Sequence, residues 1–252
     1  MSLGQLGSDL AIRDLDDPDL QGQAVTLYRR VFGQRPDAAL ELNTRLLSAV
    51  LRNGGTALGV VEGDTLLGFA VGFCGMDGGC LYHYSQTAAV APEHRGRGLG
   101  RRLKLAQAGA ARAAGASRMR WSFDPAVTRN GHFNLDVLGA TGRWYVDDFY
   151  HRPGTDRVVV DWDLEHADVT ASPGPRHPMP DPAGTDGLSV GHWSVESGVG
   201  RLAVPAAAEG PAEADRRIRQ GFHALLDRGF VARSCTRVSA DRAVYVFTGA
   251  QR

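Results

Sequence analysis

The spacing of apolar residues predicts a series of helices and strands before position 166. Apolar side chains recur every three or four residues over 18–32, 38–51 and 98–114, which indicates helices that each bury one face. Shorter apolar runs bounded by Gly, Asp or Pro indicate strands. These predicted strands lie at 10–12, 56–62, 66–74, 80–90, 119–123, 140–146 and 157–163, with a short helix at 130–138. The mixture predicts an α/β (α+β) fold.

A proline-rich segment separates this region from the C-terminal one. Residues 166–187 hold five of the chain's 12 prolines, and proline has no N–H to give to a helix or a central strand. We therefore predict a linker or a long surface loop between a domain at 1–165 and an extension at 188–252. In the extension we expect strands at 188–193, 201–205, 230–237 and 243–248 and a helix at 211–228.

Charge and hydropathy narrow the classes of function. The 28 basic and 28 acidic side chains give a formal net charge of zero, whereas a protein that coats nucleic acid or an anionic membrane usually carries a basic excess. We expect neither a nucleic-acid partner nor a membrane partner. The N-terminus lacks the apolar core of a signal peptide, and no run of about 18 apolar residues occurs, so we expect a cytoplasmic location.

The three cysteines are an odd number, and no Cys-x-x-Cys pair occurs. This usage is typical of a reducing compartment and argues against a disulfide framework and a structural zinc site. We expect no metal. Cys74 and Cys80 flank the turn at 75–79, so they either face each other across a hairpin or are two small apolar strand residues.

The segment 90–102 joins a predicted strand to a predicted helix and reads VAPEHRGRGLGRR. Glycine lets a backbone approach a ligand closely, and a helix N-terminus offers unpaired N–H groups with about half a positive charge. The segment is therefore a candidate site for a phosphate or a pyrophosphate. The residues of a Walker loop and of a dinucleotide fingerprint are absent. A nucleic-acid patch and a glycine turn with solvated arginines are the remaining alternatives.

The order Arg95-x-x-Gly98-x-Gly100, after a strand and before an amphipathic helix, resembles the acyl-coenzyme-A motif of the GNAT N-acetyltransferase superfamily. The order of elements agrees over about residues 8–164. The strings at 121–125, 129–135, 138–140 and 156–162 are similar to a subgroup described only as predicted GNAT acetyltransferases. The resemblance implies a mixed, mostly antiparallel sheet with splayed central strands. It also implies acetyl-coenzyme A as the donor and direct attack by an amine.

The resemblance implies roles for individual residues. Main-chain amides of the glycine loop, aided by two arginine side chains, would hold the pyrophosphate. The pantetheine arm would lie between the strands 80–90 and 119–123, bonded to main chain, and an asparagine would reach the coenzyme from the other side. The predicted coenzyme-binding residues are Ala88, Val90, Arg95, Gly96, Arg97, Gly98, Leu99, Gly100, Arg101 and Asn130.

The chain departs from these relatives at both catalytic positions. Many members have a tyrosine four residues before the glycine of the last helix-to-strand turn, and this chain has Leu135 there. Many also have a carboxylate on the strand that precedes the glycine loop, and residues 83–87 of that strand include none. The candidate catalytic residues are His83 and Asp124 as base, and Tyr145, ahead of Tyr150, as acid. Each is alternatively an interior or turn residue. The candidates for the acceptor pocket, or for a merely packed helix, are His132, Phe133 and Asn134.

Two functions from different classes follow. The first is acyl transfer from acetyl-coenzyme A to an amine of a small molecule or a peptide. The second is a non-catalytic module of the same fold that binds or senses acyl-coenzyme A. The extension has no motif of its own, and the arginines at 216, 217 and 219 on its predicted helix indicate a solvated face. It would extend the sheet, form a half-domain, mediate a homodimer or cover the acceptor site.

Overall fold

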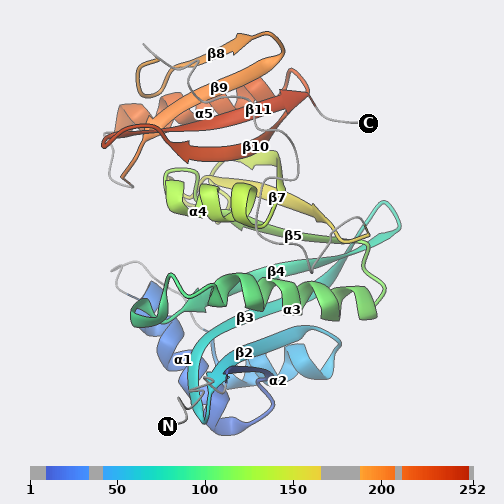
Figure 1. The fold of residues 1–252 in the computed structure, drawn as a ribbon. Helices are drawn as coiled ribbons and strands as arrows, with labels where there is room; N and C mark the ends of the chain where they lie inside the picture. The colour runs from blue at the N-terminus through green and yellow to red at the C-terminus, as the bar shows by residue number, and fades with distance from the viewer. Residues whose placement is uncertain (1–9, 34–41, 166–187, 208–211, 250–252) are drawn as a thin grey trace, which may run out of the picture. The chain divides into compact units, whose positions relative to one another are not determined.

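The computed structural model describes residues 10–33, 42–165, 188–207 and 212–249. They form two compact units. The first holds the described residues up to Met119 together with Leu164 and Glu165. The second holds Arg120–Asp163 and the described residues from 188 onward. Figure 1 labels the helices and strands of both.

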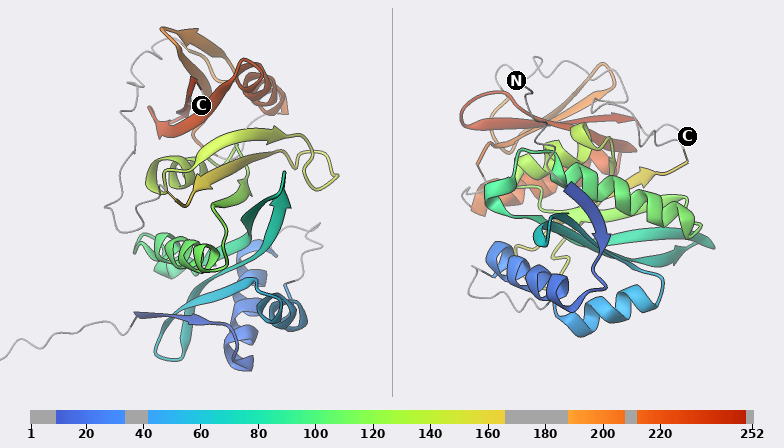
Figure 2. Two further views of the ribbon diagram at one scale, coloured as in Figure 1. Left: turned by 90° about the vertical axis from the view of Figure 1, so that its right-hand side faces the viewer. Right: turned by 60° about the horizontal axis from the view of Figure 1, so that its bottom comes forward.

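The first unit is a sheet with helices on both faces. Its strands follow the order β1-β2-β3-β4, and each neighbouring pair is antiparallel. They are β1 (Leu10–Asp14), β2 (Thr56–Glu62), β3 (Thr65–Asp77) and β4 (Cys80–Val90). The helices are α1 (Pro18–Phe32), α2 (Thr44–Arg52) and α3 (Leu99–Ala113). Figure 2 shows α1 and α2 on one side of this sheet and α3 on the other.

Alternating side chains of the strands build two apolar layers in this unit. Phe69 and Val71 pack with α1 and α2, whereas Leu67 and Ala70 pack with Leu103 of α3. Phe69, Ala70 and Val71 alternate between the layers with the period of two expected for a sheet buried on both faces. The register of β3 against β2 shifts at Leu67, which places Leu67 in the same layer as Ala70.

The helix boundaries follow their caps. The Asp17 carboxylate accepts hydrogen bonds from the amides of Asp19 and Leu20, which begins α1 at the predicted position. The predicted helix over 38–51 begins only at Thr44, because the Asn43 side chain accepts from the Leu46 amide and caps the helix there. Residues 38–41 of that prediction lie outside the described residues.

The second unit is a sheet in which the C-terminal strands follow the strands of residues 118–163. Its strand order is β5-β7-β6-β10-β11-β9-β8. The strands are β5 (Arg118–Phe123, its first two residues in the first unit), β6 (Thr141–Val146), β7 (Arg157–Asp163), β8 (Trp193–Glu196), β9 (Val199–Pro205), β10 (Phe230–Arg237) and β11 (Arg242–Gly249). The helices are α4 (Thr128–His132), the π-helix η2 (Phe133–Val137) and α5 (Ala212–Leu226). The predicted α+β class, with a mixed and mostly antiparallel sheet and a C-terminal addition, is confirmed.

The units divide the chain differently from the predicted domains at 1–165 and 188–252. The C-terminal strands continue the preceding sheet, since Ala232 of β10 pairs with Gly142 of β6. In addition, the Tyr245 hydroxyl donates to the Pro125 carbonyl over 2.9 Å. These contacts join 120–163 and the described residues from 188 onward into one unit. The predicted linker at 166–187 lies outside the described residues.

One local prediction is wrong, and one pair of alternatives is decided. The strand expected at 188–193 is absent; β8 begins at Trp193, because the chain turns at Gly191, whose φ is +81°. The two cysteines of the β3–β4 hairpin do not face each other, since Cys74 pairs with His83 and Cys80 with Asp77. No helix in the described part of the chain is long and apolar enough to cross a membrane.

Candidate functional site

The glycine loop between β4 and α3 leaves the start of a long helix open. Gly96 and Gly98 have φ values of +77° and +74°, a region that L-residues seldom adopt. Gly98 is the N-cap of α3 and has no side chain with which to cap the first N–H groups of the helix. A Cβ atom at either glycine would have no described atom within 4 Å. The loop therefore presents unpaired backbone donors, which suits an anion.

Arginine side chains surround the loop in different ways. The Arg97 guanidinium is held by two neighbouring side chains. Its Nη1 lies 2.8 Å from Nδ1 of His94, and its Nη2 lies 3.4 Å from Oε1 of Glu62. Arg95 is exposed, and its side chain makes no hydrogen bond or ion pair with the described residues, whereas its backbone amide donates to Pro92. The turn that precedes the loop is fixed to α1 by two 2.9 Å bonds from Arg30 to Glu93. Arg95 is therefore available to a phosphate, whereas Arg97 supports the loop.

The end of β4 leads into this loop with a local irregularity. The register against β3 shifts between Val71 and Gly72, so that Thr87 and Ser85 oppose them and Gln86 is the extra residue. Ala88 beyond the shift is exposed, and Val90 packs beside the apolar layer under α3. The predicted contact of Ala88 and Val90 with pantetheine stays a prediction.

His83 lies in the interior of the first unit. Its side chain has no exposed surface, and its Nε2 lies 3.1 Å from the Thr56 hydroxyl. Burial, and then the charge of Lys104, lower the pKa of His83 to about 4. This environment supports the interior interpretation of His83 over the base.

A buried polar cluster beside His83 was missed by the sequence reasoning. Lys104 is only 5% exposed, and its Nζ donates to the Ser85 hydroxyl over 2.7 Å. Ser85 in turn donates to Gln107 over 2.8 Å, and Gln107 donates to Thr56 over 3.0 Å. Burial lowers the pKa of Lys104 to about 7. The signal in the sequence was Lys104 itself, because it is the only lysine among the 28 basic residues of the chain.

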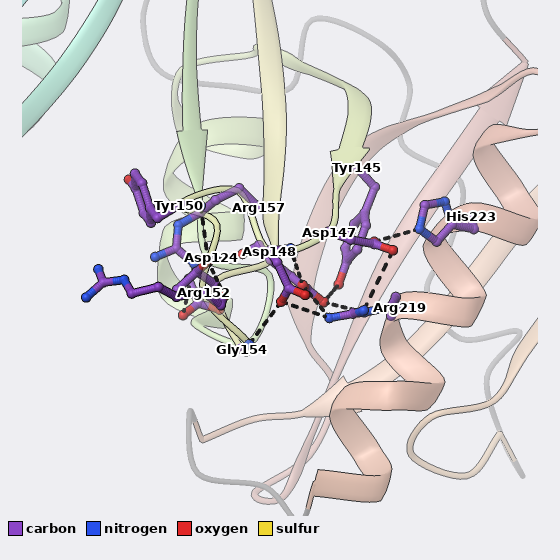
Figure 3. A network of polar contacts seen from close by, with 12 residues as sticks. Asp124, Tyr145, Asp147, Asp148, Tyr150, Arg152, Gly154, Arg157, Arg219 and His223 are labelled. Carbon is purple, nitrogen blue, oxygen red and sulfur yellow. Dashed lines mark hydrogen bonds and ion pairs between the residues drawn. The ribbon is translucent and has the colours of Figure 1, made fainter. Parts of the chain in front are cut away.

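Three of the four catalytic candidates gather around the turn between β6 and β7, shown in Figure 3. Tyr145, the first of them, donates its hydroxyl hydrogen to Oδ2 of Asp156 over 2.8 Å. Its ring stacks on Phe222 of α5, with 4.9 Å between the ring centroids. Burial, and then the hydrogen bond to Asp156, raise the pKa of Tyr145 well above its ordinary value.

Tyr150 and Asp124 both lie near the guanidinium of Arg157. The guanidinium of Arg157 lies 5.0 Å from the ring centroid of Tyr150, and one of its nitrogens lies 3.8 Å from Oδ2 of Asp124. Tyr150 is 42% exposed. Asp124 also accepts the Ala126 amide, the turn-capping bond that its alternative interpretation requires. The Tyr150 ring also packs edge-on against Phe149, with 5.1 Å between the ring centroids.

The acceptor-pocket candidates lie on α4 and η2. Nδ1 of His132 is 3.0 Å from Asp136, and the buried Asn134 accepts a 2.9 Å hydrogen bond from Trp121. Phe133 and Asn130 are partly exposed. The buried contact of Asn134 supports a packed helix, whereas His132 is exposed. The acceptor contact of His132 and the coenzyme contact of Asn130 stay predictions.

The sequence reasoning also missed Arg219, which it placed on a solvated face. Arg219 instead donates to both carboxylate oxygens of Asp156, over 2.8 and 2.6 Å. Its neighbour Arg216 fits the prediction, since it pairs with Glu213 on the same helix. The sequence pattern of the helix does not show which of the two arginines is exposed and which is paired, because the partner of Arg219 lies in a turn about 60 residues away.

The residues described hold no group of three His, Cys, Asp or Glu side chains that is arranged for a metal ion. Residues 16–134 match the model of the Acetyltransferase (GNAT) family. The search of curated proteins found no relative of this chain.

Solved structures share the fold over about three fifths of the chain. One is a protein from Desulfovibrio desulfuricans assigned to the GNAT family, with 19% identity and a TM-score of 0.50; the match covers 62% of this chain and 99% of that one. Another is the ribosomal-protein-S18-alanine N-acetyltransferase of Escherichia coli, with 14% identity and a TM-score of 0.50, covering 64% and 98%. At these identities the likeness concerns the fold. The part of the chain that matches the GNAT acetyltransferase family is thus the region 16–134, which includes the glycine loop that opens α3.

Proposed function

We propose that this chain binds acetyl-coenzyme A at the loop 95–101 and transfers its acetyl group to an amine of a small molecule or a peptide. The observation that carries the proposal is the uncapped start of α3 behind Gly96 and Gly98. A pyrophosphate there would accept hydrogen bonds from the backbone amides of 96–100 and meet the positive end of the helix dipole. Arg95 and Arg101 would add full charges.

The reaction needs a base and an acid. The amine nitrogen attacks the thioester carbonyl, a C–N bond forms and the C–S bond breaks. The nitrogen loses one proton to a base, and the departing thiolate gains one from an acid. Among the candidates, Tyr150 is the exposed phenol and Asp124 the partly exposed carboxylate. The interior position of His83 and the bond from Tyr145 to Asp156 argue against the other two.

A second candidate function is supported by one observation. Leu135 occupies the position of the usual tyrosine and is only 2% exposed, so no proton donor stands there. A chain without such a donor would bind acetyl-coenzyme A without turning it over. That outcome would make the protein a binding or sensing module.

One pair of measurements separates the two. Calorimetric titration with acetyl-coenzyme A measures binding, and release of the free coenzyme-A thiol against a panel of small amines and peptides, with hydrolysis subtracted, measures transfer. The proposal expects binding and amine-dependent thiol release together. Tight binding without release on any acceptor would favour the sensing module. Absence of binding would remove the glycine loop from the site.

A further inference from the structure

Arg219 of α5 grips the turn that connects β6 to β7. Its Nε donates to Oδ2 of Asp156 over 2.8 Å and its Nη2 donates to Oδ1 over 2.6 Å. Such a bidentate pair fixes the angle between the two groups as well as their distance. The same guanidinium lies 3.4 Å from Asp148 and 3.7 Å from Asp147. One arginine of the C-terminal addition thus holds three carboxylates of one turn.

Asp156 passes this constraint to both ends of the turn. Besides the Tyr145 hydroxyl, its carboxylate accepts the Asp148 amide over 2.9 Å, and Asp148 accepts the Gly154 amide over 3.1 Å. Asp148 and His151 have φ values of 45° and 56°. Asp and His adopt this left-handed region more often than most other residues, but it is uncommon even for them, and local hydrogen bonds help to hold them there. The turn therefore depends on these bonds for its conformation.

The constraint continues to the proposed catalytic groups. Nη1 of Arg157 donates to the main-chain carbonyl of Asp156 over 2.7 Å. That arginine is the one that lies over the Tyr150 ring and near Asp124. A change in the position of Asp156 would therefore move Arg157, and with it the surroundings of Tyr150.

We propose that Arg219 is a positioning residue for acetyl transfer, acting through Asp156 on the turn that carries Tyr150. This inference rests on the proposed function. Because Arg219 is 33% exposed, its ion pairs add little to the free energy of folding. Its main effect is on geometry. The C-terminal addition is then a part of the catalytic machinery rather than an appendage to it.

The test compares three substitutions on the same helix. Arg219→Ala removes the bidentate pair. Arg219→Lys keeps the charge without the planar fork. Arg216→Ala removes a 67% exposed arginine that pairs only within α5, and serves as the matched control. For each variant, kcat and the KM values for acetyl-coenzyme A and for the amine are measured by thiol release, with thermal unfolding as a check on folding.

We expect kcat of Arg219→Ala to fall at least tenfold with an unchanged KM for acetyl-coenzyme A. Lysine should restore only part of the loss, and Arg216→Ala should match the wild type. Asp156→Asn should lower kcat by a similar factor, and the double variant should lose no more than either single one, because the two residues act as one unit. Full kcat in a folded Arg219→Ala variant would overturn the proposal, as would independent losses in the double variant.

A separate measurement distinguishes failure of this inference from failure of the proposed function. If the wild type releases no thiol with any amine, the proposed function fails and catalytic positioning fails with it. The hydrogen-exchange rate of the Asp148 amide then still tests whether Arg219 holds the turn in place. Faster exchange in Arg219→Ala than in Arg216→Ala would support the role of Arg219 in holding the turn. Equal exchange rates would overturn that role too.

Discussion

Tyr145 and Asp156 are joined by a 2.8 Å hydrogen bond in which the phenol donates to the carboxylate. Burial and this bond raise the pKa of Tyr145 far above its ordinary value. A phenol whose proton is held so firmly is a poor donor to a departing thiolate, whose own proton affinity is lower. The contact therefore favours a structural role for Tyr145 and leaves Tyr150 as the better candidate for the acid.

Phenylalanine substitutions should separate the two tyrosines. Tyr150→Phe removes the proposed acid, so kcat for thiol release should fall by roughly 10²-fold, the usual scale for losing a general acid. Tyr145→Phe keeps the stack on Phe222 and removes one of several bonds to Asp156. We expect its kcat to fall by less than about tenfold, with the larger effect on thermal stability. The reverse order would restore Tyr145 as the acid, as its place in the sequence suggested.

Gly98→Val should weaken coenzyme binding. The variant places a branched side chain at a φ of +74°, where the backbone must also meet the phosphate. We expect affinity for acetyl-coenzyme A in calorimetric titration to fall at least tenfold, about 1.4 kcal/mol. Gly109→Ala on the same helix is the control, since Gly109 has open space around it and no positive φ. Equal affinities in the two variants would place the coenzyme elsewhere.

The sequence sufficed for features that depend on local chemistry. The bounds of α1, β2 and β4 follow from Asp17, from the turn at Gly63 and from the apolar runs, all of which act within a few residues. It failed where the partner is distant in sequence. The buried face of α3 holds Lys104 and Gln107, because hydroxyl groups on two strands receive them. The ion pair of Arg219 with Asp156 could not be predicted either, because the two residues are far apart in the sequence.

Lys104 should make the stability of the protein depend on pH. Burial lowers its folded-state pKa to about 7 from 10.5. Between these two values the unfolded chain binds one more proton than the folded chain, so the free energy of unfolding should rise with pH by about 1.4 kcal/mol per unit. Denaturant unfolding from pH 7 to pH 10 measures this slope. Other titrating groups add their own slopes, so the comparison must be made against a variant.

Lys104→Met is that variant, because it keeps most of the volume and removes the charge. We expect it to be more stable than the wild type at pH 7, with the difference shrinking as the pH approaches 10. Arg102→Met changes an exposed arginine of the same helix and should keep the wild-type slope. A constant difference between Lys104→Met and the wild type at every pH would mean that the ammonium group keeps its ordinary pKa.

Gly131→Ala should show how closely α4 packs on the C-terminal strands. A Cβ atom there would lie 2.6 Å from the Tyr245 hydroxyl and 2.9 Å from both Cβ and Sγ of Cys235. Tyr245 and Cys235 are fully buried, so neither can move away easily, and overpacking of this kind costs about 1–3 kcal/mol. Gly22→Ala in α1 meets no atom within 4 Å and should stabilise the protein by about 0.5–1 kcal/mol through helix propensity alone. Thermal unfolding of both variants measures the contrast. A Gly131→Ala variant as stable as Gly22→Ala would mean that the C-terminal strands do not pack against α4 at this distance.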